Sequence, residues 1–273
     1  MGISDLINYG FIQKALIAGS FIAFICSILG VLLVLKRFSL IGDGLAHVTF
    51  GSVAIGLLLK QHPVYISIPI VMLSSLVILK LTEKAKLYGD AAIGIVSSIG
   101  IAGGILIASI AGGFNVDLFS YLFGNILSIT KAEVFTSIAL SIIVLLSISL
   151  FYKEHFSTTF DEEFARVSGI NTKKINALLV LLTGITVVLA MKVVGIMLTS
   201  ALLILPPVTA LQIARGFKNT MAISSIIAIS SVIVGIYISL IIDLPTGATI
   251  VIINFIFFMI AFLFRSAFRR FTP

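Results

Sequence analysis

Long apolar stretches, separated by short polar clusters, dominate the hydropathy pattern of this chain. Residues 15–35, 91–116, 193–214, 219–242 and 244–264 each lack Asp, Glu, Lys, Arg and His over at least 21 positions. An α-helix needs roughly 20 apolar residues to cross a bilayer. The alternation of polar and apolar residues that a membrane β-barrel requires is absent. The pattern therefore predicts an all-α, polytopic membrane protein that forms a single transmembrane domain over residues 1–273.

Shorter apolar segments extend this set to nine candidate spans. Because some segments are short or interrupted, we expect about eight to nine crossings. The candidate ranges are 15–35, 43–59, 63–80, 91–113, 133–152, 174–191, 193–214, 219–242 and 245–264.

Three segments depart from a plain spanning helix. Residues 114–130 are apolar but too short to cross, which predicts a re-entrant or interfacial helix. Pro206 and Pro207 stand in the middle of 193–214 and remove two backbone donors, so we expect this helix to kink or split there. Residues 241–250 contain Pro245 and predict a turn at a membrane boundary.

The composition agrees with a lipid environment and excludes several classes of protein. Of the 273 residues, 59% are hydrophobic and 11% are charged, whereas soluble domains carry about a quarter charged residues. The only cysteine, Cys26, excludes an internal disulfide. The net charge of +7 fits basic cytoplasmic loops, so we expect membrane lipid and no nucleic acid among the partners.

The positions of the basic residues predict the orientation in the membrane. With the N-terminus outside, the 18 Lys and Arg residues divide into 14 cytoplasmic and four external ones. We therefore expect a cytoplasmic C-terminus. The external residues are Lys14, Lys60, Lys131 and Lys192; the cytoplasmic ones are Lys36, Arg37, Lys80, Lys84, Lys86, Lys153, Arg166, Lys173, Lys174, Arg215, Lys218, Arg265, Arg269 and Arg270.

The one sizeable polar segment, residues 153–174, falls on the cytoplasmic side in this arrangement. Thr159 is the expected cap of a short helix at 160–168, and Gly169 is expected to end it. The acidic residues Asp161, Glu162 and Glu163 suit the first turn of such a helix. The segment is either a solvated connector or a docking element for a cytoplasmic partner.

Asp43 and His47 are the candidate metal ligands, because their i, i+4 spacing places them on one face of a helix. Asp243, at the end of a long charge-free run, is a third candidate, although all three also fit ordinary boundary positions. Together they suit a borderline cation such as zinc or manganese. We expect His62 in a surface turn and His155 in solvent, and we treat Glu133 as a boundary charge.

Several functional motifs are missing. The chain has no G-x-x-x-x-G-K-[ST] sequence for ATP hydrolysis and no H-E-x-x-H zinc-protease sequence, so we do not expect an enzyme. Any ATP-driven activity would need a separate nucleotide-binding subunit. An ion-coupled secondary transporter and a permease for a metal chelate remain alternatives.

Four collinear segments resemble the zinc/manganese ABC permease family. They are KRFSLIGDGLAHVTFGSVAIGLLL (36–59), VDLFSYLFGNILSIT (116–130), AMKVVGIMLTSALLILPPVTALQIAR (190–215) and DLPTGATIVI (243–252). The family's Pro-Ala pair is Pro206-Pro207 here, and Ser98 stands near a position where some zinc-type members carry histidine. The motif forms are closer to those of zinc permeases than to those of manganese permeases.

The resemblance implies a metal-importing subunit of a bacterial cytoplasmic membrane. It implies a permease homodimer, two copies of an ATP-binding subunit and an extracytoplasmic metal-binding protein. No cofactor is implied, and the cargo is a zinc or manganese ion. Asp43, His47 and Asp243 are expected to line the metal pathway. The residues expected to couple the permease to the ATPase are Phe160, Asp161, Glu162, Glu163, Ala165 and Gly169.

Overall fold

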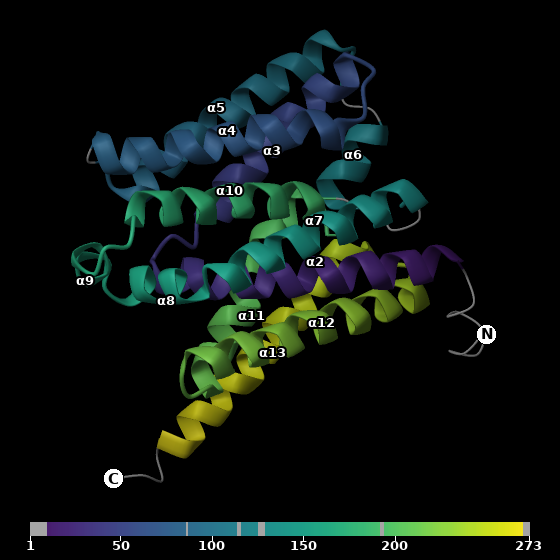
Figure 1. Ribbon diagram of the computed structural model, residues 1–273. Coiled ribbons are helices and arrows are strands. Elements are labelled where there is room, and N and C mark those ends of the chain that lie inside the picture. The colour runs from purple at the N-terminus through teal and green to yellow at the C-terminus, as the bar shows by residue number, and fades with distance from the viewer. Residues whose placement is uncertain (1–9, 86, 114–115, 125–128, 192–193, 270–273) are drawn as a thin grey trace.

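The computed structural model describes residues 10–85, 87–113, 116–124, 129–191 and 194–269, and these form an all-α bundle with no strand among them (Figure 1). The helices are α2 (Gly10–Leu35), α3 (Ile41–Leu58), α4 (Pro63–Lys84), α5 (Gly89–Ile110), α6 (Val116–Phe123), α7 (Lys131–Leu150), α8 (Tyr152–Phe160), α9 (Glu162–Val167), α10 (Thr172–Ala190), the 3-10 turn η2 (Ile196–Leu198), α11 (Thr199–Ile213), α12 (Phe217–Ile242) and α13 (Thr246–Arg269).

Eight of the described helices are long and apolar enough to cross a membrane, which confirms the predicted polytopic architecture. They are α2, α3, α4, α5, α7, α10, α12 and α13. The ninth candidate, 193–214, contains only the shorter apolar helix α11, preceded by η2. The predicted short helix after α5 is present as α6, which has eight residues.

The expected split at Pro206 and Pro207 is wrong, because α11 continues through both prolines, and a kink there stays a prediction. The chain instead breaks at Gly195, whose φ of 92° is accessible to glycine. A Cβ atom there would lie 2.5 Å from the backbone of Phe123, so the end of α6 packs directly on this position. A proline is tolerated inside a membrane helix when neighbouring helices cover the backbone groups that it leaves without a partner. Both prolines of α11 are buried in this way.

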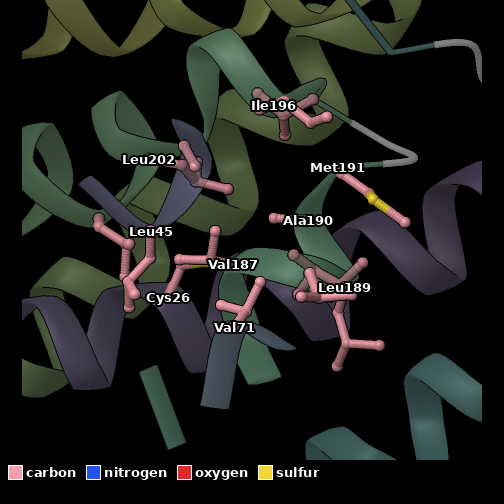
Figure 2. Packing of buried hydrophobic residues seen from close by; sticks show 14 of the residues in the cluster. Cys26, Leu45, Val71, Val187, Leu189, Ala190, Met191, Ile196 and Leu202 are labelled. Carbon is pink, nitrogen blue, oxygen red and sulfur yellow. The ribbon is translucent and has the colours of Figure 1, made fainter. Parts of the chain in front are cut away.

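The helices form three groups side by side (Figure 1). Helices α3, α4 and α5 pack together on one side, and α11, α12 and α13 pack together on the other. Helices α2 and α10 lie between these groups and contact each other. Helix α10 also contacts α3 and α4, and α2 also contacts α11 and α12. Figure 2 shows how side chains such as Cys26, Leu45, Val71 and Val187 meet in the resulting apolar core.

Polar contacts also join helices inside the bundle. Ser27 of α2 and Ser225 of α12 lie within 2.9 Å through their hydroxyls, and Ser52 of α3 donates to Ser67 of α4 at 2.7 Å. Small hydroxyl residues allow close approach of membrane helices and satisfy each other across the interface. These contacts fix α2, α3 and α4 relative to their neighbours.

The two ends of the bundle differ. Helices α8 and α9 lie at one end and α6 lies near the other (Figure 1). Two basic residues that were predicted to be cytoplasmic contact neighbouring helices. Lys218 lies over the ring of Tyr152, the first residue of α8, at 5.9 Å, and Arg265 of α13 donates to Gln212 of α11 at 2.6 Å. Lys86, Lys192 and Arg270 of the charge prediction lie outside the described residues.

Candidate metal and coupling sites

The first turns of α3 hold the candidate metal pair. Asp43 lies in the first turn, where a negative charge is favourable beside the helix N-terminus, and His47 follows one turn later. His47 Nε2 and Asp43 Oδ2 are 3.6 Å apart, and the two side chains are 22% and 51% exposed. For a cation about 2.1 Å from each atom, the N–metal–O angle would be roughly 110–120°, which is close to the angle of a tetrahedral site. The distance between the two atoms is therefore compatible with both binding one ion.

Close backbone packing holds this part of α3 in place. A Cβ atom on Gly42 would lie 2.7 Å from Leu203 Cδ1 of α11, and one on Gly100 of α5 would lie 2.8 Å from the Val48 backbone. Both neighbouring helices thus approach α3 at van der Waals distance around Asp43 and His47. A shift of α3, α5 or α11 therefore changes the surroundings of the pair.

Asp243 does not join this pair in the structure. It ends α12 in a left-handed conformation, with φ of 57° and ψ of 49°, and it is exposed. Its turn is held by Ser239, which donates to the Leu244 carbonyl at 2.6 Å and lies 2.9 Å from the Thr246 hydroxyl. Within the described part of the chain, no group of three His, Cys, Asp or Glu side chains is placed to hold a metal ion.

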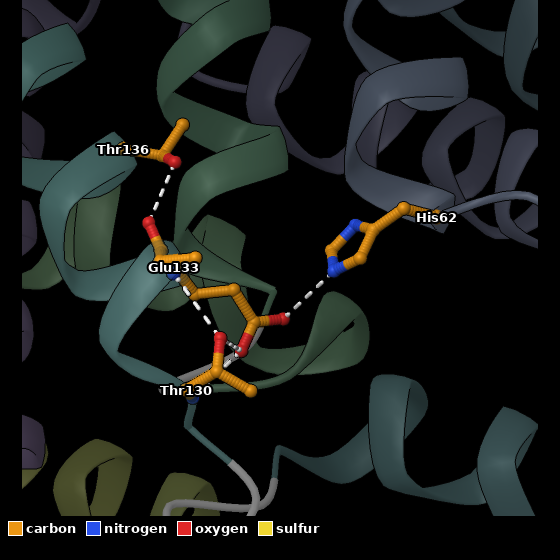
Figure 3. A network of polar contacts seen from close by, with 5 residues as sticks. His62, Thr130, Glu133 and Thr136 are labelled. Atoms are coloured by element: carbon orange, nitrogen blue, oxygen red, sulfur yellow. Dashed lines mark hydrogen bonds and ion pairs between the residues drawn. The ribbon is translucent and has the colours of Figure 1, made fainter.

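A second polar pair, formed by His62 and Glu133, was not foreseen. His62 Nε2 lies 3.5 Å from Glu133 Oε1 at the start of α4 and α7 (Figure 3). Glu133 Oε2 accepts from the Thr130 backbone and hydroxyl at 2.9 Å, which completes a capping box on α7. The T-x-x-E sequence signals the capping box, but no local signal joins His62 to a residue 71 positions away.

Helices α8 and α9 build the predicted coupling segment at the opposite end from α6. The cap of α9 is Asp161, which accepts from the Phe164 backbone at 2.8 Å, and the expected cap Thr159 is wrong. Thr159 lies inside α8, where its hydroxyl donates to the His155 carbonyl at 2.6 Å. Gly169, with φ of 87°, ends α9 as predicted: its N–H and that of Ile170 donate to the carbonyls of the last turn.

Large apolar side chains are exposed at the end of α8 and along α9. Phe160, Phe164 and Val167 are 59%, 65% and 88% exposed, whereas Ala165 is fully buried. Glu162 and Glu163 lie on the solvent side of the first turn. Sequence reasoning missed Phe164 and Val167, although large apolar residues in an acidic six-residue helix are themselves an unusual pattern. Phe160, at the end of α8, and Phe164 and Val167 of α9 are together called the α9 apolar surface below.

His155 corrects another expectation, because it is only 1% exposed within α8. Neither ring nitrogen has a hydrogen-bond partner among the described residues. Burial lowers the pKa of His155 to about 4, and the nearby Lys36 charge acts in the same direction. The imidazole is therefore neutral at physiological pH. Amphipathic packing of α8 on the bundle explains why a residue in a polar segment is buried.

Three comparisons place the chain among known proteins. The model of the ABC 3 transport family matches residues 8–265. The manganese transport system membrane protein MntC of Listeria monocytogenes is 34% identical over 262 residues, covering 96% of this chain and 93% of the relative. The high-affinity zinc uptake system membrane protein ZnuB of Haemophilus influenzae is 31% identical over 258 residues, covering 94% and 96%. A solved structure, PsaBC from Streptococcus pneumoniae in complex with Fab, has a TM-score of 0.86 and 31% identity, covering 95% of this chain and 94% of that one.

Proposed function

Because this chain belongs to the ABC 3 transport family, we propose that it is the permease subunit of an ATP-driven importer for a divalent transition metal. The observation that carries this proposal is the Asp43–His47 pair, placed on one face of the apolar helix α3. An ionisable side chain within a membrane segment is costly, so its presence points to a function in transport.

The pair is suited to transient binding of the cargo. Two ligands from one helix fill only part of the coordination sphere, so the ion can be captured and released again, as conduction requires. Asp243 remains our predicted third ligand. Because it lies apart from the pair in this structure, it would have to reach the ion by movement of the α12–α13 turn or from the second subunit of a homodimer.

The cargo is either manganese or zinc. The sequence motifs favour zinc, and the similarity to MntC supports manganese equally well. One imidazole nitrogen and one carboxylate oxygen are acceptable to both ions. The geometry of the pair is therefore compatible with either cargo.

The energy is proposed to come from two copies of a separate ATPase subunit. The chain lacks a nucleotide-binding sequence of its own, and the α9 apolar surface offers a docking site at the end of the bundle. The basic residues that predict a cytoplasmic location include Lys36, Lys153 and Arg166, which flank this surface in sequence or space. An extracytoplasmic binding protein would deliver the metal at the α6 end.

Uptake of radioactive manganese and zinc into proteoliposomes that contain the permease, its ATPase and its binding protein tests the proposal. We expect His47→Ala and Asp43→Asn each to reduce ATP-dependent uptake by roughly tenfold or more, because each removes a ligand. His62→Ala is the matched control, since His62 is a half-exposed histidine beyond the other end of α3, and uptake should be unchanged. Normal uptake by the His47 variant would reject the ligand assignment.

The same assay separates the rival mechanisms. Uptake that continues without ATP or the ATPase would indicate an ion-coupled secondary transporter instead. Competition between the two isotopes in the wild-type complex would decide between manganese and zinc. Asp243→Asn should match Asp43→Asn if Asp243 is a ligand, and unchanged uptake would remove it from the pathway.

A further inference from the structure

A chain of polar side chains joins α9 to the turn that precedes α3, the helix with the candidate metal ligands. Asn176 of α10 donates from Nδ2 to Glu162 Oε1 of α9 at 3.2 Å. Its Oδ1 accepts from Lys36 Nζ at 2.5 Å. Lys36 directly follows α2, and α3 begins five residues later at Ile41. One amide thus bridges the coupling helix and the α2–α3 turn.

The surroundings of Lys36 show that this contact is more than a loose surface interaction. Burial lowers the pKa of Lys36, and the negative charge of Glu162 opposes that shift. A partly desolvated ammonium group needs a fixed partner, because burying a charge without one is costly. Lys36 is therefore held by its hydrogen bond to Asn176, and the nearby Glu162 charge favours its ammonium form.

The α2–α3 turn is rigid enough to transmit such a movement. The Arg37 and Phe38 backbone N–H groups donate to the carbonyls of Val34 and Leu33, and Arg37 has a left-handed φ of 58°. This pattern closes the C-terminus of α2 in the way a glycine cap usually does. A displacement of the Lys36 side chain is therefore passed through this hydrogen-bonded turn to the start of α3.

Space for the movement is available next to the chain. A cavity of about 360 Å³ is lined by Lys36, Arg37, Glu83, Thr158, Glu162 and Asn176, among others. It lies between the ends of α2, α4, α8, α9 and α10. Because packed interiors resist continuous deformation, a cavity at this junction permits the polar groups to shift together.

We infer that the Glu162–Asn176–Lys36 chain transmits the position of the ATPase-bound α9 to α3, and so couples ATP hydrolysis to release of the metal at Asp43 and His47. Asn176 and Lys36 are positioning residues in this scheme and do not touch the cargo. The inference rests on the proposed function. It predicts that breaking the chain separates ATP hydrolysis from transport without undoing the complex.

The test uses the complete permease–ATPase complex with its binding protein in proteoliposomes. Asn176→Leu keeps the branched shape of the side chain but removes both hydrogen bonds, and Lys36→Met keeps the stem but removes the amine. For each variant, ATP hydrolysis and metal uptake are measured separately. We expect the number of ions transported per ATP to fall roughly tenfold, as losing a hydrogen bond to a charged group implies.

Two further variants make the result specific. Asn219→Leu is the matched control, because Asn219 near the start of α12 donates to the carbonyl of Arg215, four residues earlier, and is not part of the chain; its transport ratio should equal that of the wild type. Phe164→Asp should instead prevent co-purification of the ATPase. Combining Asn176→Leu with Lys36→Met should be no worse than either change alone, because both residues act in one chain.

The outcomes separate this inference from the proposed function. If the wild-type complex shows no ATP-driven metal uptake, the proposed function fails. If it does, and both Asn176→Leu and Lys36→Met assemble and keep the wild-type ratio, the relay alone is wrong. Additive losses in the double variant would also overturn it, since they indicate independent structural damage. Should Asn176→Leu fail to assemble, Lys36→Met decides the matter by the same ratio.

Discussion

Substitution of Gly30 by alanine is a direct test of how α2 and α11 fit together. In the variant, the new Cβ atom would lie 2.1 Å from the Leu203 carbonyl oxygen and 2.7 Å from Pro207 Cγ. The Leu203 carbonyl is the group that loses its helical donor, because Pro207 has no N–H. Ordinary contact would require the two helices to separate by more than about 1 Å, since non-bonded heavy atoms rest near 3.5–4 Å.

The cost of this separation follows from the packing. Adding a methyl group to a filled interior costs about 1–3 kcal/mol, and here the obstacle is backbone that cannot rotate away. The effect should also reach the metal pair, because Leu203 Cδ1 lies against Gly42, next to Asp43. We therefore expect Gly30→Ala to lower both the free energy of unfolding and the rate of metal uptake.

Unfolding of purified protein in mixed detergent, followed by circular dichroism against increasing SDS, measures the first effect. The matched control is Gly184→Ala in α10, a buried helical glycine whose added Cβ would meet Val71 Cγ1 at 3.5 Å, an ordinary contact. Alanine is favoured over glycine within a helix by roughly 0.5–1 kcal/mol, so this control should be neutral or slightly stabilising. Equal stability of the two variants would refute the close-packing argument.

Two further predictions concern His155 and the orientation of the chain. The pKa of His155 is about 4 in the folded state against 6.5 in the unfolded state. Between these values the unfolded state binds one more proton than the folded state. The free energy of unfolding should therefore decline as pH falls from 6.5 towards 4 and should stay level above pH 6.5. Thermal unfolding across this range should show a smaller decline for His155→Leu, and an equal decline would contradict the assignment. In a chain with Cys26→Ala, an impermeant thiol reagent should label Gln61→Cys in intact cells and should label Lys153→Cys only after permeabilisation; the reverse would invert the proposed orientation.

The sequence by itself determined the fold class and the positions of most helices. Lipid offers no hydrogen bonds to backbone groups, so long apolar runs are expected to form helices. For example, the expected spans 219–242 and 15–35 correspond to α12 and α2 within a few residues. The Asp43–His47 pair was also predictable, because its geometry depends only on the helical repeat.

Local rules failed where several interactions compete. Thr159 and Asp161 are both good caps in sequence, and the structure selects Asp161 because α8 extends to Phe160. The prolines of α11 removed donors as expected, but α11 packs against α2 and continues through both prolines. The chain leaves the helical conformation at Gly195 instead, where the end of α6 packs against it. In both cases the deciding contact comes from another element.

Only the tertiary structure decided which distant polar groups meet. Lys36 and Asn176 are 140 positions apart, and His62 and Glu133 are 71 positions apart, so no helical period relates them. The same is true of Asp243, which a linear motif placed with Asp43 and His47 and which the structure leaves outside their reach. Hydrophobicity fixes where a helix lies along the chain, but the pairing of its polar side chains depends on how close-packed neighbours, often glycines, allow the helices to approach.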